Sequence, residues 1–219
     1  MKIAIDGPAG SGKSTVAKRL SQVLGYEYLD TGALYRGAAW LLKERQIPID
    51  QEELVRKALE EAVFSFSGNR LFLNGQCIED HIRSNAISKI VSLAASRPYV
   101  REILTRSMKE IARTTPDIIL DGRDIGTVVL PEAEVKIFLD AGVGVRARRR
   151  HLELQEKGEV VDLQLLEEES HLRDHLDRTR KDGPLAIAAD AVVIHTDDMT
   201  IEEVVSRMVE IRNNALLKQ

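Results

Sequence analysis

Residues 7–14 read GPAGSGKS and directly follow a short apolar run at residues 3–5 that ends at Asp6. The β-branched content of that run favours a buried strand. After Gly12, apolar residues recur at helical spacing until Gly25, which predicts a helix that begins beside Lys13. The stretch therefore matches G-x-x-x-x-G-K-[ST] between a strand and a helix, the context that this motif requires. Such a loop places backbone N–H groups around phosphate oxygens at the positive end of a helix.

The polar residues of this motif have defined chemical uses. Lys13 is expected to reach the outer phosphates of a nucleotide, and the Ser14 hydroxyl to ligate Mg²⁺. Asp121 ends the apolar run 118–120, where an acid close to the phosphate loop can hold Mg²⁺ through a water. Taken alone, an aspartate after a strand is as often a turn former or a helix cap. The motif indicates a nucleotide and not a reaction, because motors, GTPases and small-molecule kinases share it.

The rest of the chain alternates short apolar runs with helical patterns. Strands are predicted at residues 26–29, 118–120, 135–139 and 192–194. Thr31, Asp50 and Thr200 are expected to cap helices. Strands that alternate with helices predict an α/β fold with a mostly parallel sheet covered on both faces.

Residues 63–78 depart from this alternation. Their apolar residues alternate with polar ones, and two hairpin signals, Gly68-Asn69 and Asn74-Gly75, lie among them. This pattern predicts a small antiparallel sheet inserted into the α/β frame. Helices are expected to follow it over residues 85–113.

Composition limits the classes of protein to which the chain can belong. It has 219 residues, 43% of them apolar, and a net charge of -4, which suits one folded domain and argues against general nucleic-acid binding. A single cysteine, Cys77, excludes a disulfide framework and a cysteine-based zinc cluster. The first residues do not fit a signal peptide, and no stretch approaches the ~20 apolar residues of a membrane span. We expect a soluble, cytoplasmic protein that binds neither nucleic acid nor a membrane.

Arginine is concentrated in the second half of the chain. Arg146 and Arg148 are expected to lie on a solvated helix face. Arg173, Asp177 and Arg180 fall at helical spacing and should share one face. That face is either an ion-pair ladder, which stabilises little when exposed, or the source of positive charge that phosphoryl transfer needs.

Taken together, these motifs resemble those of the bacterial cytidylate kinases. The resemblance is carried by the phosphate loop, by LDTGALYR at residues 29–36, by DGRDIGT at residues 121–127 and by residues 173–185, and it extends over essentially the whole chain. It implies the fold of a P-loop kinase of the nucleoside monophosphate kinase type. That fold has a central parallel five-stranded sheet flanked by helices, with a small antiparallel sheet inserted in the monophosphate-binding region.

The resemblance also implies a domain plan and an oligomeric state. A single domain would span residues 1–219, with its core at 1–30, 115–150 and 185–219. The monophosphate-binding region would be residues 31–114, and the lid with the arginine segment residues 151–184. The resemblance further implies that the protein is a monomer.

The activity that the resemblance implies is transfer of the γ-phosphoryl group of ATP, with Mg²⁺, to CMP or dCMP. Ser14 and Asp121 would hold the metal, while Lys13, Arg123 and Arg180 would be catalytic. ATP would contact the phosphate loop and two basic residues that can face its phosphates when the lid closes. These residues are Gly7, Pro8, Ala9, Gly10, Ser11, Gly12, Lys13, Ser14, Thr15, Arg149 and Lys157.

The acceptor nucleotide has its own implied residues. Its phosphate would be held by Arg36, Arg123 and Arg180 with the Thr31 hydroxyl, its base by Ser92, Arg101 and Asp124, and its sugar by Arg173 and Asp177. Thr31 stands where the family often has serine, and a hydroxyl is retained. Arg178 stands where the family commonly has serine, which leaves the choice between CMP and dCMP open.

Two alternatives remain at this point. One is a kinase with the same loop that acts on a sugar acid or on another nucleotide. The other is an ATPase or nucleotide switch, which would turn over ATP without an acceptor.

Overall fold

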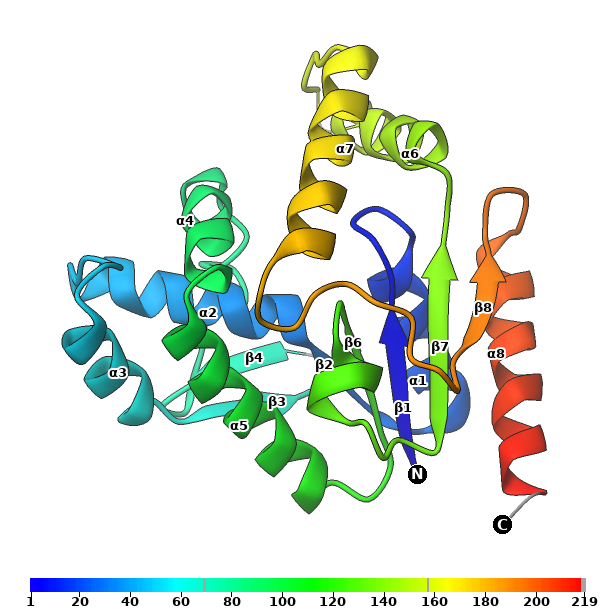
Figure 1. The fold of residues 1–219 in the computed structure, drawn as a ribbon, viewed down its shortest axis with the longest axis horizontal. Helices are drawn as coiled ribbons and strands as arrows, with labels where there is room; N and C mark the ends of the chain where they lie inside the picture. The colour runs from blue at the N-terminus through cyan, green and yellow to red at the C-terminus, as the bar shows by residue number, and fades with distance from the viewer. Residues whose placement is uncertain (69, 157, 218–219) are drawn as a thin grey trace. The chain divides into compact units, whose positions relative to one another are not determined.

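The computed structural model describes residues 1–68, 70–156 and 158–217 (Figure 1). The chain divides into two compact units, residues 1–26 with 119–219 and residues 27–118. Within the described residues, the larger sheet has five strands in the order β2-β6-β1-β7-β8, and the smaller has three in the order β3-β4-β5. The predicted five-stranded sheet with a small antiparallel insertion is therefore confirmed. Among the described residues, no helix combines the length and the apolar character that crossing a lipid bilayer requires.

The first unit carries the phosphate loop. Its elements are β1 (Lys2–Asp6), α1 (Lys13–Leu24), β6 (Ile118–Gly122), a π-helical turn η1 (Ile125–Val129), β7 (Val135–Asp140), α6 (Val143–Glu156), α7 (Leu163–Thr179), β8 (Val192–His195) and α8 (Ile201–Leu216). Helices α1 and α8 pack on each other, α1 against β1 and α8 against β7. Helices α6 and α7 pack together as a pair.

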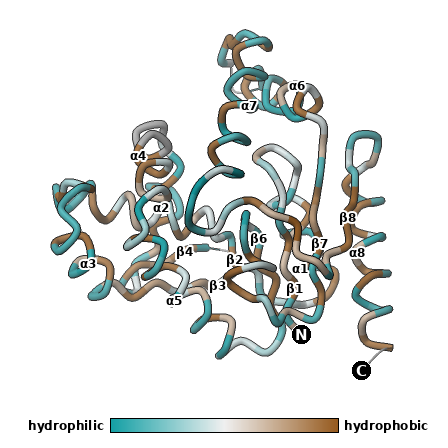
Figure 2. The backbone as a smooth tube through the Cα atoms, viewed as in Figure 1, coloured by the Kyte–Doolittle hydropathy of each residue, from teal (hydrophilic) through white to brown (hydrophobic). Residues whose placement is uncertain are grey.

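The strands of this unit are parallel and apolar. Strand β1 pairs with β7, from Ile3 opposite Val135 to Asp6 opposite Phe138, and β7 pairs with β8. Figure 2 shows β1 and β7 as largely hydrophobic stretches of chain. The carboxyl ends of parallel strands open at the same edge of a sheet, which is where ligands bind in α/β proteins. The phosphate loop follows the carboxyl end of β1, and Asp121 lies at the carboxyl end of β6.

The second unit consists of helices and the small sheet. Its elements are β2 (Glu27–Asp30), α2 (Thr31–Glu44), α3 (Glu52–Glu60), β3 (Phe64–Ser67), β4 (Arg70–Leu73), β5 (Gln76–Cys77), α4 (Asn85–Ala95) and α5 (Pro98–Thr114). The β3–β4 and β4–β5 pairs are antiparallel. Asn74 and Gly75, between β4 and β5, have φ angles of 49° and 82°, as a tight hairpin turn requires. Asn69, of the other hairpin signal, lies outside the described residues.

Two of the three expected helix caps are wrong. Asp30 and not Thr31 is the N-cap of α2, because its carboxylate accepts a hydrogen bond from the Ala33 N–H at 2.8 Å. Gln51 and not Asp50 precedes α3, without a side-chain cap. Thr200 caps α8 as predicted and forms a capping box with Glu203.

Candidate nucleotide site

The phosphate loop is built around a close approach of backbone to backbone. Gly7 has φ of 151°, and a Cβ at this position would lie 2.1 Å from the carbonyl oxygen of Leu139 in β7. Only glycine fits between the two strands at this point. The chain then turns through residues 8–12 into α1, whose N-terminal N–H groups supply the positive end of the helix. The geometry of this loop suits a polyphosphate.

Lys13 lies buried inside this loop. Its ammonium group donates hydrogen bonds to the Pro8 carbonyl at 2.6 Å and to Ser11 Oγ at 3.3 Å. Burial and the positive charge of Arg123 hold the pKa of Lys13 well below its usual value, although the carboxylates of Asp121 and Asp6 act in the opposite sense. A phosphate bound beside Lys13 would favour its charged form.

Ser14 and Asp121 meet as expected. Ser14 Oγ donates a hydrogen bond of 2.8 Å to Asp121 Oδ2, which joins the first turn of α1 to the end of β6. Among the described residues there is no cluster of three or more His, Cys, Asp or Glu side chains that could hold a metal. A hydroxyl and one carboxylate are the kind of oxygen ligands that Mg²⁺ accepts when substrate phosphates supply the others. These two residues therefore fit Mg²⁺ in a nucleotide complex.

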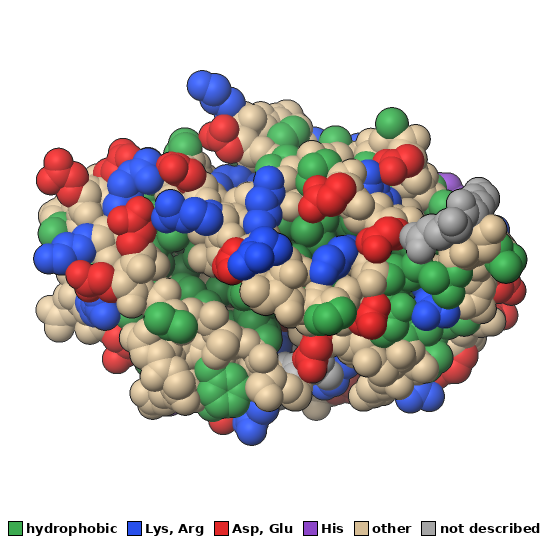
Figure 3. All heavy atoms as spheres, turned by 90° about the horizontal axis from the view of Figure 1, so that it is seen from below, with side chains coloured by type: hydrophobic (Ala, Val, Ile, Leu, Met, Phe, Trp, Pro, Cys, Tyr) green, Lys and Arg blue, Asp and Glu red, His purple; other side chains and the backbone are tan. Residues whose placement is uncertain are grey.

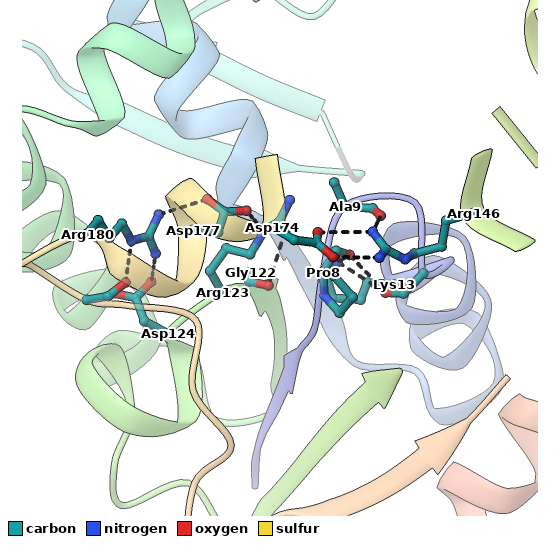
Figure 4. Close-up of polar contacts among 12 residues, drawn as sticks. Pro8, Ala9, Lys13, Gly122, Arg123, Asp124, Arg146, Asp174, Asp177 and Arg180 are labelled. Atoms are coloured by element: carbon teal, nitrogen blue, oxygen red, sulfur yellow. Dashed lines mark hydrogen bonds and ion pairs between the residues drawn. The ribbon is translucent and has the colours of Figure 1, made fainter. Parts of the chain in front are cut away.

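Four charged residues form an ion-pair cluster beside the loop. Arg123 Nε donates to Asp177 Oδ2 at 2.8 Å, and Arg180 lies 3.4 Å from Asp177 Oδ1 and 3.5 Å from Asp124 Oδ1 (Figure 4). Burial alone would raise the pKa of Asp177, but the charge and hydrogen bond of Arg123, with Arg180, hold it below its ordinary value. The cluster gathers two guanidinium groups at one place, as binding a phosphate would require.

Asp6 is a residue of this region that the sequence did not single out as functional. Its buried carboxylate accepts hydrogen bonds from the N–H groups of Ile125 and Gly126 at 2.8 and 2.7 Å. It thereby fixes the start of η1, directly after Arg123 and Asp124. The sequence did contain a signal for this role: a charged residue ends an apolar strand directly before a glycine-rich loop.

The arginines of α6 do not all lie where the sequence suggested. Arg146 is only 2% exposed, so its assignment to a solvated face is wrong; its guanidinium is held by carbonyl groups and by Asp174. Arg148 is exposed, as expected. Arg149 donates to the carbonyl oxygen and hydroxyl of Thr196 at 2.5 and 3.3 Å. Lys157, the other residue predicted to contact ATP from the lid, lies outside the described residues.

The second unit holds four further predicted residues, whereas Arg173 lies on α7 of the first unit. Thr31 is buried at the start of α2, and Arg36 on the same helix forms a 3.0 Å ion pair with Asp30. Arg101 on α5 is 6% exposed, and its guanidinium lies over the ring of Tyr35, 5.7 Å from the centroid. Ser92 is exposed on α4. Buried or half-buried arginines recur in this unit, as in the first.

The face seen in Figure 3 is mixed in charge, with acidic and basic side chains interspersed. The arginines that could bind an anion are identified instead by their burial and by their contacts.

Comparison with known proteins gives a consistent result. A family model described as cytidylate kinase matches residues 3–214. A cytidylate kinase of Caldanaerobacter subterraneus subsp. tengcongensis is 46% identical over 215 residues, which cover 98% of this chain and 96% of that protein. One of Thermosipho melanesiensis is 47% identical over 210 residues, with 96% and 95% covered. In fold, the chain is similar to a shikimate kinase from Bacteroides thetaiotaomicron, with a TM-score of 0.53, 15% identity and coverage of 97% and 98%.

Proposed function

The chain belongs to the cytidylate kinase family, and from this premise we propose that it transfers the γ-phosphoryl group of ATP, in the presence of Mg²⁺, to CMP and dCMP. The observation that carries the proposal is the combination of the phosphate loop, with Ser14 bound to Asp121, and the Arg123–Asp177–Arg180–Asp124 cluster in the same unit. The first suits a nucleoside triphosphate. The second suits an acceptor that carries both a phosphate and polar groups.

We assign ATP to the phosphate loop, residues 7–15. Backbone N–H groups and Lys13 would bind its phosphates, and Ser14 with Asp121 would hold Mg²⁺. When bound, the metal would neutralise charge on the phosphates. Arg149, in α6 just before the lid, and Lys157, in the lid (residues 151–184), are assigned to the ATP side. Arg149 would have to exchange its contacts with Thr196 to reach a phosphate.

The acceptor's phosphate is assigned to Arg36, Arg123 and Arg180 with Thr31, and its sugar to Arg173 and Asp177. Support comes from charge and burial: Arg123 and Arg180 are largely buried and already have carboxylate partners at 2.8 to 3.5 Å. A phosphate offers the same kind of anionic oxygen acceptor as those carboxylates, so it can share their guanidinium groups through charge-assisted hydrogen bonds.

Cytosine is assigned to Asp124, Ser92 and Arg101. Its exocyclic amine is a donor, which suits the Asp124 carboxylate and the Ser92 hydroxyl, and its N3 and O2 are acceptors, which suit Arg101. Uracil presents a carbonyl where cytosine has the amine, so a carboxylate would face a lone pair. Such a mismatch costs on the order of 1–3 kcal/mol for each buried group.

Catalysis by these residues would rest on alignment and charge. The attacking group is an anionic phosphate oxygen, so no general base is needed. Lys13, Arg123 and Arg180 would offset the charge of the two phosphates and hold them in line. Exclusion of water by the lid would limit hydrolysis of ATP.

The test is ADP formation with Mg-ATP and CMP, dCMP, UMP, AMP or GMP, against a control without acceptor. We expect turnover with CMP and dCMP to exceed the others by a wide margin. Equal turnover with and without an acceptor would instead indicate an ATPase or switch. High turnover with an unrelated acceptor, such as a sugar acid, would overturn the assignment of cytosine.

A further inference from the structure

A buried arginine connects the phosphate loop to the helix that carries the arginine segment. Arg146, in the first turn of α6, is 2% exposed. One of its terminal nitrogens, Nη1, donates to the carbonyl oxygen of Ala9 in the phosphate loop at 2.9 Å and to Asp174 Oδ1 in α7 at 3.0 Å. The other, Nη2, donates to Asp174 Oδ2 at 2.5 Å (Figure 4). We call these contacts with Ala9 and Asp174 the Arg146 tie.

The arginine is itself fixed from two further directions. Its Nε donates to the carbonyl of Ala141, in the turn between β7 and α6, at 2.9 Å. A Cβ on Gly10 would lie 3.2 Å from the Cβ of Arg146, so the loop packs closely on the stem of this side chain. The guanidinium therefore has little freedom to move without moving the loop or α7.

The two ends of the tie lie next to the residues assigned to the reaction. Ala9 belongs to the loop that surrounds Lys13. Asp174 follows Arg173 and lies one helical turn before Asp177, which pairs with Arg123. A rotation or slide of α7 would therefore displace Asp177 and Arg180 relative to the loop. The Arg146 tie therefore fixes the position of α7 relative to the phosphate loop.

The chemistry favours arginine and aspartate at these two positions. A planar guanidinium can bind a carboxylate with two parallel hydrogen bonds and a carbonyl with a third, whereas an ammonium group is a point donor without this fixed geometry. A buried charge that loses its partner is costly, so each member holds the other in place. An ion pair at the surface would not impose this geometry.

We propose that Arg146 is a positioning residue for phosphoryl transfer, and that its contacts with Ala9 and Asp174 hold the arginine-bearing face of α7 in register with the phosphate loop. This inference rests on the proposed function and deepens it. Arg146 does not contact the reacting atoms; it acts through the loop and through α7. A misplacement of about 1 Å is enough to cost roughly a hundredfold in rate, so the register matters.

The test compares the intact wild-type chain with Arg146→Lys, Asp174→Asn and Asp174→Glu. Asp174→Glu keeps the charge but lengthens the side chain by one methylene, so the ion pair can persist while α7 is displaced. We expect kcat with CMP to fall about 10- to 100-fold in each variant, and the KM for ATP to change much less. The double variant Arg146→Lys with Asp174→Asn should be no slower than the slower single variant, because both remove the same tie.

Arg150→Lys is the matched control. Arg150 lies on the same helix and pairs with Glu153 at 3.1 Å, but this pair is exposed on both sides. Its kcat should equal that of the wild type. Urea unfolding of every variant separates a loss of register from a loss of folded protein.

A purely structural role predicts a different result: lower unfolding midpoints with kcat per folded molecule within about twofold of the wild type, which would overturn the proposal. If Asp174→Asn fails to fold, Asp174→Glu carries the decision in the same way. Wild-type protein without CMP-dependent ADP formation would contradict the proposed function itself. An active wild type with equally active variants would contradict only the positioning role.

Discussion

The backbone N–H of Gly126 donates a 2.7 Å hydrogen bond to the carboxylate of Asp6, 120 residues away in the chain. A second bond, from the Ile125 N–H, reaches the other oxygen at 2.8 Å. Together they attach the π-helical turn η1 to the strand that precedes the phosphate loop. Short π-helical turns are frequent at functional sites, and this one directly follows Arg123 and Asp124.

The buried carboxylate of Asp6 is expected to make the free energy of unfolding depend on pH. Burial raises the pKa of Asp6 to about 6, with the nearby Asp124 in the same sense, although the two N–H groups and Lys13 oppose the shift. The pKa of Asp6 is lower in the unfolded chain than in the folded one. Between pH 4 and 6 the folded state therefore binds more protons than the unfolded state, and Asp6 contributes most to the free energy of unfolding at low pH. The full effect is about 3 kcal/mol, and it is lost as pH rises through 6.

Urea unfolding of the wild type and Asp6→Asn between pH 4 and 8 measures this effect. The difference in unfolding free energy, wild type minus variant, should grow as the pH is lowered from 7 to 4. Taking the difference removes contributions from other carboxylates, such as Asp177, whose lowered pKa acts oppositely. Parallel curves for the two proteins would show that Asp6 does not titrate in this range.

Replacement of Asp124 by asparagine should weaken the choice of base. The amide offers both a donor and an acceptor, so uracil is no longer rejected by a buried carboxylate. We expect the ratio of kcat/KM for CMP to that for UMP to fall about tenfold or more. The variant also loses the ion pair with Arg180, but that loss affects both substrates, so the ratio isolates recognition of the base. An unchanged ratio would remove Asp124 from that role.

Ser14→Ala should increase the concentration of Mg²⁺ needed for half-maximal rate. The variant loses a metal ligand and leaves Asp121 without the 2.8 Å hydrogen bond of the hydroxyl. Initial rates measured against free Mg²⁺ at constant ATP would detect the change. Ser21→Ala on the same helix, where the hydroxyl donates to the Lys18 carbonyl, is the control and should follow the wild-type curve. Identical curves for all three proteins would exclude Ser14 as a ligand.

Arg149→Ala should lower kcat or raise the KM for ATP by roughly tenfold or more, because hydrogen bonds of a guanidinium to a phosphate are charge-assisted. Arg148→Ala is the comparison. Arg148 is exposed, and its Nε donates to the Gly144 carbonyl of its own helix at 3.4 Å. If both variants kept the wild-type constants, the bond of Arg149 to Thr196 would be its whole role and the lid assignment would fail.

Gly7→Ala should be far more destabilising than Gly12→Ala. Both residues have positive φ, which strains a residue with a Cβ; for the left-handed Gly12 the cost is about 1–2 kcal/mol. Only at Gly7 would the added Cβ also lie 2.1 Å from a backbone oxygen, whereas nothing lies within 4 Å at Gly12. Urea unfolding of the two variants compares them directly. Equal losses would mean that β1 and β7 can separate without penalty.

Local patterns predicted much of the fold. The glycine motif identified the β1–α1 unit, and Asn74-Gly75 identified the turn between β4 and β5, because backbone conformation at these positions depends on the residues themselves. Helices were expected over residues 85–113. The break between α4 and α5 was not predicted, although it falls at Arg97-Pro98, where proline cannot continue a helix. These are short-range effects.

What the sequence did not predict depends on distant packing. Nothing within the run RARRR distinguishes Arg146 from Arg148; the difference arises because α7 and the phosphate loop cover one and leave the other exposed. The N-caps at Asp30 and Gln51 differ by one residue from the expected ones. At α2 the Asp30 side chain reaches a free N–H group, whereas at α3 no side-chain cap forms, because this depends on how the chain enters each helix. The approach of Arg123 to Asp177 likewise joins residues 54 positions apart.

The pairing of β1 with β7 has a consequence for how the molecule is made. Ile3 cannot meet Val135 until more than a hundred further residues have been synthesised, and contacts of such high sequence separation form slowly. The unit at residues 27–118 is continuous in sequence, so it can fold while β1 still waits for its neighbour. The phosphate loop precedes Leu139 by more than a hundred residues, yet its geometry depends on that residue. On the ribosome, the loop can therefore take its working shape only after the much later strand β7 has been made.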